Sequence, residues 1–123
     1  MKSFRLLKIV SCALATAYLQ IEVCAQDKLS FNHDVRPILS AHCFECHGPD
    51  AKARKAKLRL DEAASATASR DGAIAVVPGK PEDSELLDRV LSEDPDEVMP
   101  PPELKRVLTA EQKKTLRRWI AEG

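Results

Sequence analysis

Large aromatic side chains are scarce in this sequence. Its 123 residues include one Trp, one Tyr and three Phe. A chain of this length holds one domain, and a domain this small buries little apolar surface when it folds. The sequence therefore predicts a core that needs a bound group to complete it.

An excess of either charge is also absent. The 19 basic residues balance the 19 acidic residues. Nucleic-acid-binding domains and polybasic membrane anchors carry an excess of Lys and Arg, so the balance argues against both. The sequence also contains no acid–base pair, nucleophile triad or phosphate loop, and we do not expect an enzyme.

The first 25 residues have the pattern of a signal peptide. Three basic residues lie among the first eight, and the apolar stretch over 9–18 is too short to span a bilayer comfortably. Small side chains predict cleavage after Ala25. We expect residues 1–25 to be a signal peptide and residues 26–123 to be a domain exported to the periplasm or beyond. An uncleaved leader would anchor that domain to the membrane.

Cysteine is almost absent from the exported part. Of the four cysteines, Cys12 and Cys24 lie in the leader, which leaves Cys43 and Cys46. Two cysteines three positions apart cannot form the disulfide framework of a small secreted protein. Their spacing has to be explained in another way.

Residues 43–47 have the sequence Cys-Phe-Glu-Cys-His, the C-x-x-C-H pattern of c-type haem attachment. The two thiols can add to the two vinyl groups of one porphyrin. His47 then lies under the ring plane with its imidazole directed at the iron. The pattern thus predicts one covalently attached haem c, bound by Cys43, Cys46 and His47.

Two other kinds of site use similar residues. A thioredoxin-like site places C-x-x-C near a βαβ pattern, and no strand is predicted before Cys43. A structural zinc site needs four ligands, commonly in two separated pairs. The two remaining histidines, His33 and His42, are not spaced as a second pair. Haem attachment is therefore the preferred interpretation.

A sixth ligand for the iron must come from another part of the chain. Met99 is the methionine outside the leader, and it precedes three prolines. A residue before proline is pushed toward an extended backbone, and consecutive prolines are stiff, so this segment could hold a thioether rigidly. The ordinary alternative for Met99 is to fill a gap in the core. His33 and His42 are weaker candidates. His42 in particular lies on the attachment side of the ring.

The haem-attachment motif follows a predicted helix. Apolar residues at helical spacing run from Phe31 to His42. Pro37 cannot lie deep in a helix, so Asp34 is the expected N-cap. Five basic side chains follow over residues 52–59, where we expect either a solvated loop or a docking patch beside the haem edge.

Two further helices are predicted downstream. One covers residues 84–91, and the other begins at Thr109, which matches a capping box with Gln112. Their expected apolar faces are Leu86, Leu87, Val90 and Leu91 in the first helix and Leu116, Trp119 and Ile120 in the second. No strand of convincing length is found, so the predicted domain is all-α.

Several segments of the sequence form a set that is specific in combination. They are residues 31–39, 43–48, 58–61, 77–79, 99–101 and 119–123. With them the chain from residue 31 to residue 123 resembles the planctomycete-type cytochrome c domain. The resemblance implies a class I cytochrome c-like fold of three to four helices around one haem, with His47 as proximal ligand and Met99 as distal ligand. Family members usually continue into large further domains.

The expected function is that of a single-haem c-type cytochrome that transfers single electrons in the periplasm, alone or as the electron-accepting module of a larger exported protein. His/Met ligation raises the reduction potential relative to bis-histidine ligation. We expect a redox protein as partner, no small-molecule substrate at the iron and no nucleic acid. The alternative is a haem-based enzyme or gas-sensing module with a labile sixth ligand. A haem-free interaction module is a third hypothesis.

Overall fold

The computed structural model describes residues 27–123 and consists mainly of helices. The predicted signal peptide lies outside the described residues. The α-helices are α1 (Arg36–His42), α2 (Ala63–Ala66), α3 (Glu85–Leu91) and α4 (Ala110–Glu122). Single turns of other helix types cover Phe31–Val35, Pro81–Asp83 and Pro102–Leu104. No helix of the described part has both the length and the apolar character needed to cross a bilayer.

The first helical segment begins earlier than the sequence predicted. Phe31–Val35 forms a π-helical turn that continues into α1, and Ser30, not Asp34, is its N-cap. Pro37 has no N–H, and its ring crowds the carbonyl four residues before it, which favours a wider turn at this point. Asp34 lies inside the turn, where its carboxylate accepts a hydrogen bond from the Ser30 N–H at 2.7 Å.

Helix α4 begins as predicted. The Thr109 hydroxyl oxygen accepts a hydrogen bond from the Gln112 N–H at 3.2 Å, and the Gln112 side-chain oxygen accepts one from the Thr109 N–H at 2.9 Å. These two bonds satisfy donors that a helix start leaves unpaired. The capping box is therefore confirmed.

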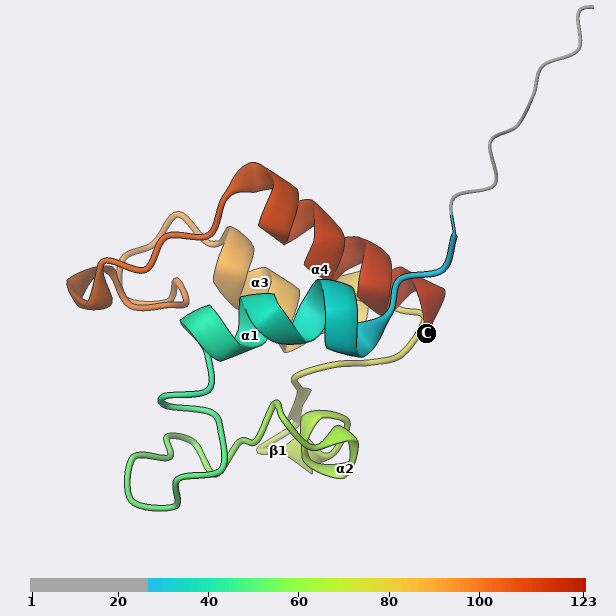
Figure 1. Cartoon of the computed structure of the whole chain (residues 1–123). Helices are drawn as coiled ribbons and strands as arrows, with labels where there is room; N and C mark the ends of the chain where they lie inside the picture. The colour runs from blue at the N-terminus through green and yellow to red at the C-terminus, as the bar shows by residue number, and fades with distance from the viewer. Residues whose placement is uncertain (1–26) are drawn as a thin grey trace, which may run out of the picture.

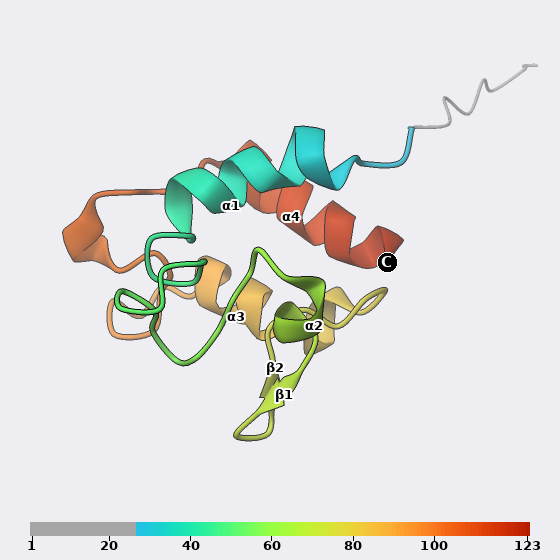
Figure 2. The same cartoon turned by 60° about the horizontal axis from the view of Figure 1, so that its bottom comes forward.

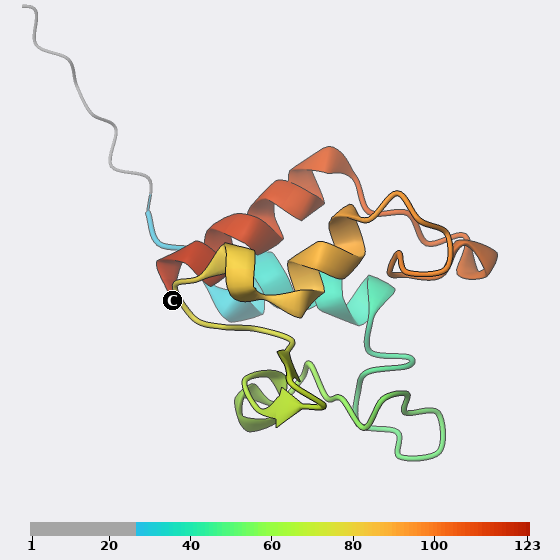
Figure 3. The same cartoon turned by 180° about the vertical axis from the view of Figure 1, so that it is seen from behind.

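Helices α1, α3 and α4 enclose the core, and α2 lies apart from these three helices, next to the hairpin (Figures 1 and 2). Seen from behind, α3 lies in front of α1 and beside α4 (Figure 3). The buried apolar residues are Val35, Ile38, Leu39, Leu60, Ala66, Ala75, Val76, Leu86, Leu87, Val90, Leu108, Leu116 and Ile120. Leu91 was expected on the buried face of α3, but it is the last residue of that helix and is 46% exposed.

A short hairpin corrects the all-α prediction in one place. Strands β1 (Ser69–Arg70) and β2 (Ala73–Ile74) pair antiparallel. Asp71 and Gly72 connect them, with φ angles of 52° and 88°. Asp-Gly is the preferred sequence of a tight hairpin turn with positive φ at both positions. That dipeptide was the available signal, but the strands are too short to show an alternating pattern.

The two ends of the described chain lie side by side. The Leu29 N–H donates to the Glu122 carboxylate at 2.7 Å, and the Arg118 guanidinium donates to the Asp27 carbonyl. Figure 1 shows the start of the described chain beside the C-terminus, at the opposite end of the molecule from the Pro102–Leu104 turn. The attachment motif after α1 lies nearer to that turn, so the candidate site is far from both ends.

Candidate functional site

The C-x-x-C-H residues form a compact turn after α1. The Cys43 N–H donates to the Leu39 carbonyl at 2.7 Å, and the His47 N–H donates to the Cys43 carbonyl at 2.8 Å. The chain then folds back, and the Lys55 N–H donates to the Cys46 carbonyl at 2.7 Å. These backbone bonds hold both thiols and the imidazole within one local structure.

Gly48 allows this turn to close. A Cβ atom at Gly48 would lie 2.2 Å from the Phe44 carbonyl oxygen, so only glycine fits. The Arg54 guanidinium then donates to the carbonyls of Gly48 and Pro49 at 3.1 and 2.9 Å. The Arg54 side chain thus holds the loop that follows the motif.

Two adjoining cavities converge on the motif. We call the first, of about 240 Å³, the central cavity, and the second, of about 300 Å³, the attachment cavity. The central cavity is lined by Cys43, His47, Ala56, Leu58, Leu60, Ala75, Glu85, Leu86, Arg89, Val90 and Met99. The attachment cavity is lined by His42, Cys43, Cys46, His47, Lys55, Ala56, Met99, Pro100, Pro101, Glu103 and Leu104. Cys43, His47, Ala56 and Met99 line both.

The four residues predicted to bind haem therefore meet in one region. Cys43, His47 and Met99 line both cavities, and Cys46 lines the attachment cavity. Met99 comes from a segment 52 positions after His47, so its place beside His47 is a long-range feature of the fold. The side chains bring together two thiols, an imidazole and a thioether.

The backbone of Met99 is anchored independently of its side chain. The Met99 N–H donates to the carbonyl of Arg89, in the last turn of α3, at 3.0 Å. Pro101 has an extended backbone with φ −57° and ψ 141°, as the sequence predicted for the proline run. The following Pro102 already begins a single helical turn. Met99 is thus held between the end of α3 and a stiff segment.

The segment after the prolines is tied to the attachment motif. The Arg106 guanidinium forms an ion pair with Glu45, which lies between the two cysteines. The His42 ring nitrogen Nδ1 hydrogen-bonds the Arg106 carbonyl at 3.3 Å. Sequence reasoning missed both contacts, because they join positions about sixty residues apart and carry no local pattern.

The alternative histidine ligands lie in different settings. His33 is 87% exposed in its side chain, pairs with Asp34 at 2.8 Å and lies in the π turn before α1. His42 lines the attachment cavity, but its Nδ1 contacts the Arg106 carbonyl. Neither lines the central cavity, whereas Met99 does.

The electrostatics of Cys43 oppose a thiol redox function. Burial raises the pKa of the Cys43 thiol to about 11. A redox-active C-x-x-C cysteine needs a lowered pKa so that the reactive thiolate forms near neutral pH. The fold therefore gives Cys43 the opposite property.

The imidazole of His47 is prepared to act as a neutral donor. Burial lowers the pKa of His47, and a hydrogen bond with the Lys55 backbone opposes this shift in part. The buried Nδ1 atom of His47 has no hydrogen-bond partner among residues 27–123. A buried polar atom without a partner costs about 1–3 kcal/mol. Neutral imidazole is the form that ligates metals.

These features fit a haem group. Imidazole and thioether are common axial donors to haem iron, and His47 and Met99 line the same apolar space. Leu58, Leu86 and Val90 provide apolar walls for a porphyrin plane. Within residues 27–123, no three His, Cys, Asp or Glu side chains are grouped so as to hold a metal ion by themselves.

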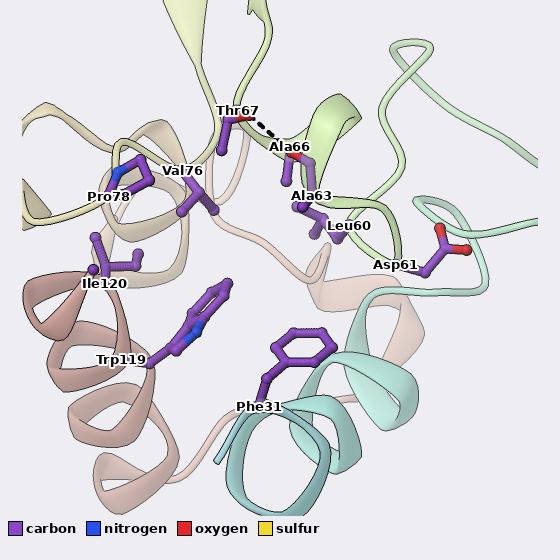
Figure 4. Close-up of a pocket in the computed structure, with 11 residues that line it drawn as sticks. Phe31, Leu60, Asp61, Ala63, Ala66, Thr67, Val76, Pro78, Trp119 and Ile120 are labelled. Carbon is purple, nitrogen blue, oxygen red and sulfur yellow. Dashed lines mark hydrogen bonds between the residues drawn. The ribbon is translucent and has the colours of Figure 1, made fainter. Parts of the chain in front are cut away.

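A separate apolar cavity of about 360 Å³ lies on the far side of Leu60. Figure 4 shows Trp119 and Phe31 pointing into it, with Leu60 and Val76 opposite. The rings of Trp119 and Phe31 lie 5.6 Å apart. Trp119 was expected in the buried face of α4, but it is only half-buried because this cavity opens beside it. The cavity contains none of the predicted haem-binding residues.

Comparison with known proteins supports the same assignment. Residues 43–103 match the model of a family described as Planctomycete cytochrome C. The match begins at the first attachment cysteine and extends past Met99. Neither the curated proteins nor the solved structures provide a significant match to the chain. With the motif, the cavities and the family match in agreement, residues 43–103 of this chain form a domain of the Planctomycete cytochrome C family.

Proposed function

We propose that this chain is a single-haem c-type cytochrome that carries single electrons outside the cytoplasm, alone or as the electron-accepting module of a larger exported protein. Membership of a cytochrome c family indicates haem-based electron transfer. The observation that carries the finer proposal is that His47 and Met99 line the same two cavities beside Cys43.

Each residue of the site has a distinct role in this proposal. Cys43 and Cys46 would hold haem through thioether bonds, and His47 and Met99 would ligate its iron. When bound, haem supplies a one-electron couple between ferric and ferrous iron. If His47 and Met99 both ligate the iron, no position remains there for a substrate, which favours an electron carrier over an enzyme.

The apolar wall residues tune the site. Leu58, Leu86 and Val90 give the central cavity an apolar wall. An apolar environment disfavours the more highly charged oxidised state, and thioether ligation acts in the same direction. The site is therefore suited to a relatively high reduction potential.

A redox partner would approach at the mouth of the attachment cavity. Lys55, Ala56, Glu103 and Leu104, which we call the rim, are the exposed residues of its lining. This combination of two apolar residues and two charges of opposite sign is suited to a transient protein contact. The leader pattern supports export to the periplasm, where an uncleaved leader would tether the domain to the membrane.

Haem attachment can be tested directly on exported protein. The full chain would be produced in a bacterial host with a cytochrome c maturation system, next to a Cys43→Ala/Cys46→Ala variant. We expect a pyridine haemochrome spectrum with one haem per chain, and a haem stain that survives a denaturing gel. The variant should lose the stain. Colourless exported protein with the mass of the bare polypeptide would contradict the proposal.

Ligand binding separates the proposed function from the gas-sensing alternative. A six-coordinate haem held by His47 and Met99 should not bind carbon monoxide readily in the reduced protein. A labile sixth ligand would allow rapid binding and a shift of the Soret band. The second result would favour the sensor or enzyme.

A further inference from the structure

A third cavity, of about 540 Å³, adjoins the central cavity. We call it the basic cavity. It is lined by Ala56, Lys57, Leu58, Arg70, Asp71, Ala73, Ala75, Glu85 and Arg89. Five of these residues, Ala56, Leu58, Ala75, Glu85 and Arg89, also line the central cavity. The basic cavity shares only Ala56 with the attachment cavity and is lined by neither cysteine, so the three cavities form a series in which the central cavity is the middle member.

The basic cavity has more charged side chains in its lining than the other two cavities. Its lining includes three cations, Lys57, Arg70 and Arg89, and two carboxylates, Asp71 and Glu85. The lining of the central cavity includes only the pair Glu85 and Arg89 at this end. An anionic group that extends out of the central cavity would therefore meet an excess of positive charge.

Arg89 is placed at the boundary between the two cavities. Its Nε donates to the Glu85 carboxylate at 2.9 Å, and its Nη1 lies 3.5 Å from the Glu97 carbonyl. A guanidinium has five N–H donors, so donors remain for a further acceptor. Arg70 is more fully used, since its guanidinium donates to Ser65 and to the Ala68 carbonyl. Lys57 is exposed on the loop beside the cavity.

The chemistry of haem defines which group would reach this place. In haem, the two vinyl groups lie on one half of the ring and the two propionate carboxylates on the opposite half. Cys43 and Cys46 assign the vinyl half to the attachment cavity, because both cysteines line it. The opposite half then faces the end of the series where Arg89 and Lys57 lie.

We propose that Arg89, assisted by Lys57, binds the haem propionates at the boundary of the central and basic cavities. The inference rests on the proposed function, since it requires haem in the site. Guanidinium groups are well suited to carboxylates, which they bind through two parallel hydrogen bonds. Glu85 orients the guanidinium through its bond to Nε. Arg89 is thus a positioning residue that connects the carboxylate end of haem to α3.

Arg89 also contacts Met99, through its backbone carbonyl oxygen and not through its guanidinium. The Arg89 carbonyl accepts the hydrogen bond from the Met99 N–H at 3.0 Å. A side-chain substitution at Arg89 leaves that carbonyl in place. The effect of the guanidinium can therefore be measured while the Met99 backbone contact is kept.

The test compares Arg89→Gln, Arg89→Lys and Arg117→Gln in haem-loaded protein. Arg117→Gln is the matched control, because Arg117 also pairs with a glutamate, Glu82 at 2.5 Å, but lines none of the three cavities. The readouts are the midpoint reduction potential and the propionate bending bands in resonance Raman spectra. We expect Arg89→Gln to lower the potential, because a cation that disfavours ferric haem is lost, and to shift the bands. Arg89→Lys should restore most of both.

Several outcomes separate this inference from the proposed function. Wild-type protein without haem would contradict the proposed function itself. Haem-loaded Arg89→Gln with an unchanged potential and unchanged bands would overturn the propionate assignment alone, as would equal shifts in Arg117→Gln. If Arg89→Gln does not accumulate, Lys57→Gln decides, since Lys57 is exposed. A smaller shift in the same direction supports the assignment, and unchanged readouts overturn it.

Discussion

Among the individual residues, Met99 has two attachments that serve different purposes. Its N–H is bonded to the end of α3, and its side chain lines both the central and the attachment cavity. The backbone bond fixes where the residue lies, and the side chain remains available as a donor. Removal of the thioether should therefore change the chemistry of the site more than its shape.

Met99→Ala should open the iron to external ligands. We expect carbon monoxide to bind to the reduced protein, and the reduction potential to fall because thioether ligation is lost. Leu58→Ala is the matched control, since it removes apolar bulk from the same central cavity without removing a sulfur. The measurement is the visible spectrum with and without carbon monoxide. An unchanged spectrum in Met99→Ala would refute the ligand assignment.

Gly48 should tolerate no side chain. Gly48→Ala places a Cβ 2.2 Å from the Phe44 carbonyl oxygen, and such overpacking typically costs about 1–3 kcal/mol. Gly72→Ala is the control, because a Cβ there meets nothing within 4 Å, although its φ of 88° favours glycine. Urea unfolding of the haem-loaded variants measures the difference. A smaller loss for Gly48→Ala than for Gly72→Ala would show that the turn can relax.

At the scale of the helices, α4 has a start signal in its own sequence. Its first turn is closed by Thr109 and Gln112, and its buried residues Leu116 and Ile120 pack into the core. Helix α4 contacts both α3 and the π turn before α1. A change in the stability of the first turn of α4 should therefore also affect α3, whose residues line the central cavity.

Thr109→Ala should lower the free energy of unfolding by about 1 kcal/mol, because the side-chain cap of α4 is lost. Thr115→Ala is the control: Thr115 lies inside α4, where alanine is the better helix former. Thermal or urea unfolding of the two variants provides the measurement. Equal stability of Thr109→Ala and the wild type would mean that the first turn of α4 is not part of the cooperative unit.

The elements also differ in how far the sequence could predict them. The capping box of α4 is a local pattern, and so is the C-x-x-C-H motif. The π turn before Pro37 depends on how the backbone relieves one crowded carbonyl, and the exposure of Leu91 depends on the packing around the end of α3. Met99 was found by elimination. The tie between Glu45 and Arg106, and the position of Arg89, required the folded arrangement.

For the molecule as a whole, the helices are short. Helices α1 and α3 have seven residues each, and α4 has 13. Isolated helices below about 12–15 residues are marginal in water, so these helices depend on packing. The cavities that converge on Cys43 and His47 remove some of that packing from the centre of the fold.

The chain without haem should therefore be largely unstructured. In Cys43→Ala/Cys46→Ala protein we expect weak helical far-UV circular dichroism and uncooperative thermal unfolding, because the centre of the fold remains unfilled. Haem-loaded wild-type protein in the same buffer is the reference. Fully native helicity in the haem-free variant would count against a role of haem in folding.

The position of the chain ends has a consequence for how this module can be mounted. Leu29 and Glu122 are hydrogen-bonded, whereas the Pro102–Leu104 turn, which contributes Glu103 and Leu104 to the rim of the attachment cavity, lies at the other end of the molecule (Figure 1). A lipid-bound tail or a covalently joined neighbour at either terminus would leave from the end opposite the rim. Lys55 and Leu104 would then still face outward, so immobilisation and electron exchange would use opposite poles of the protein.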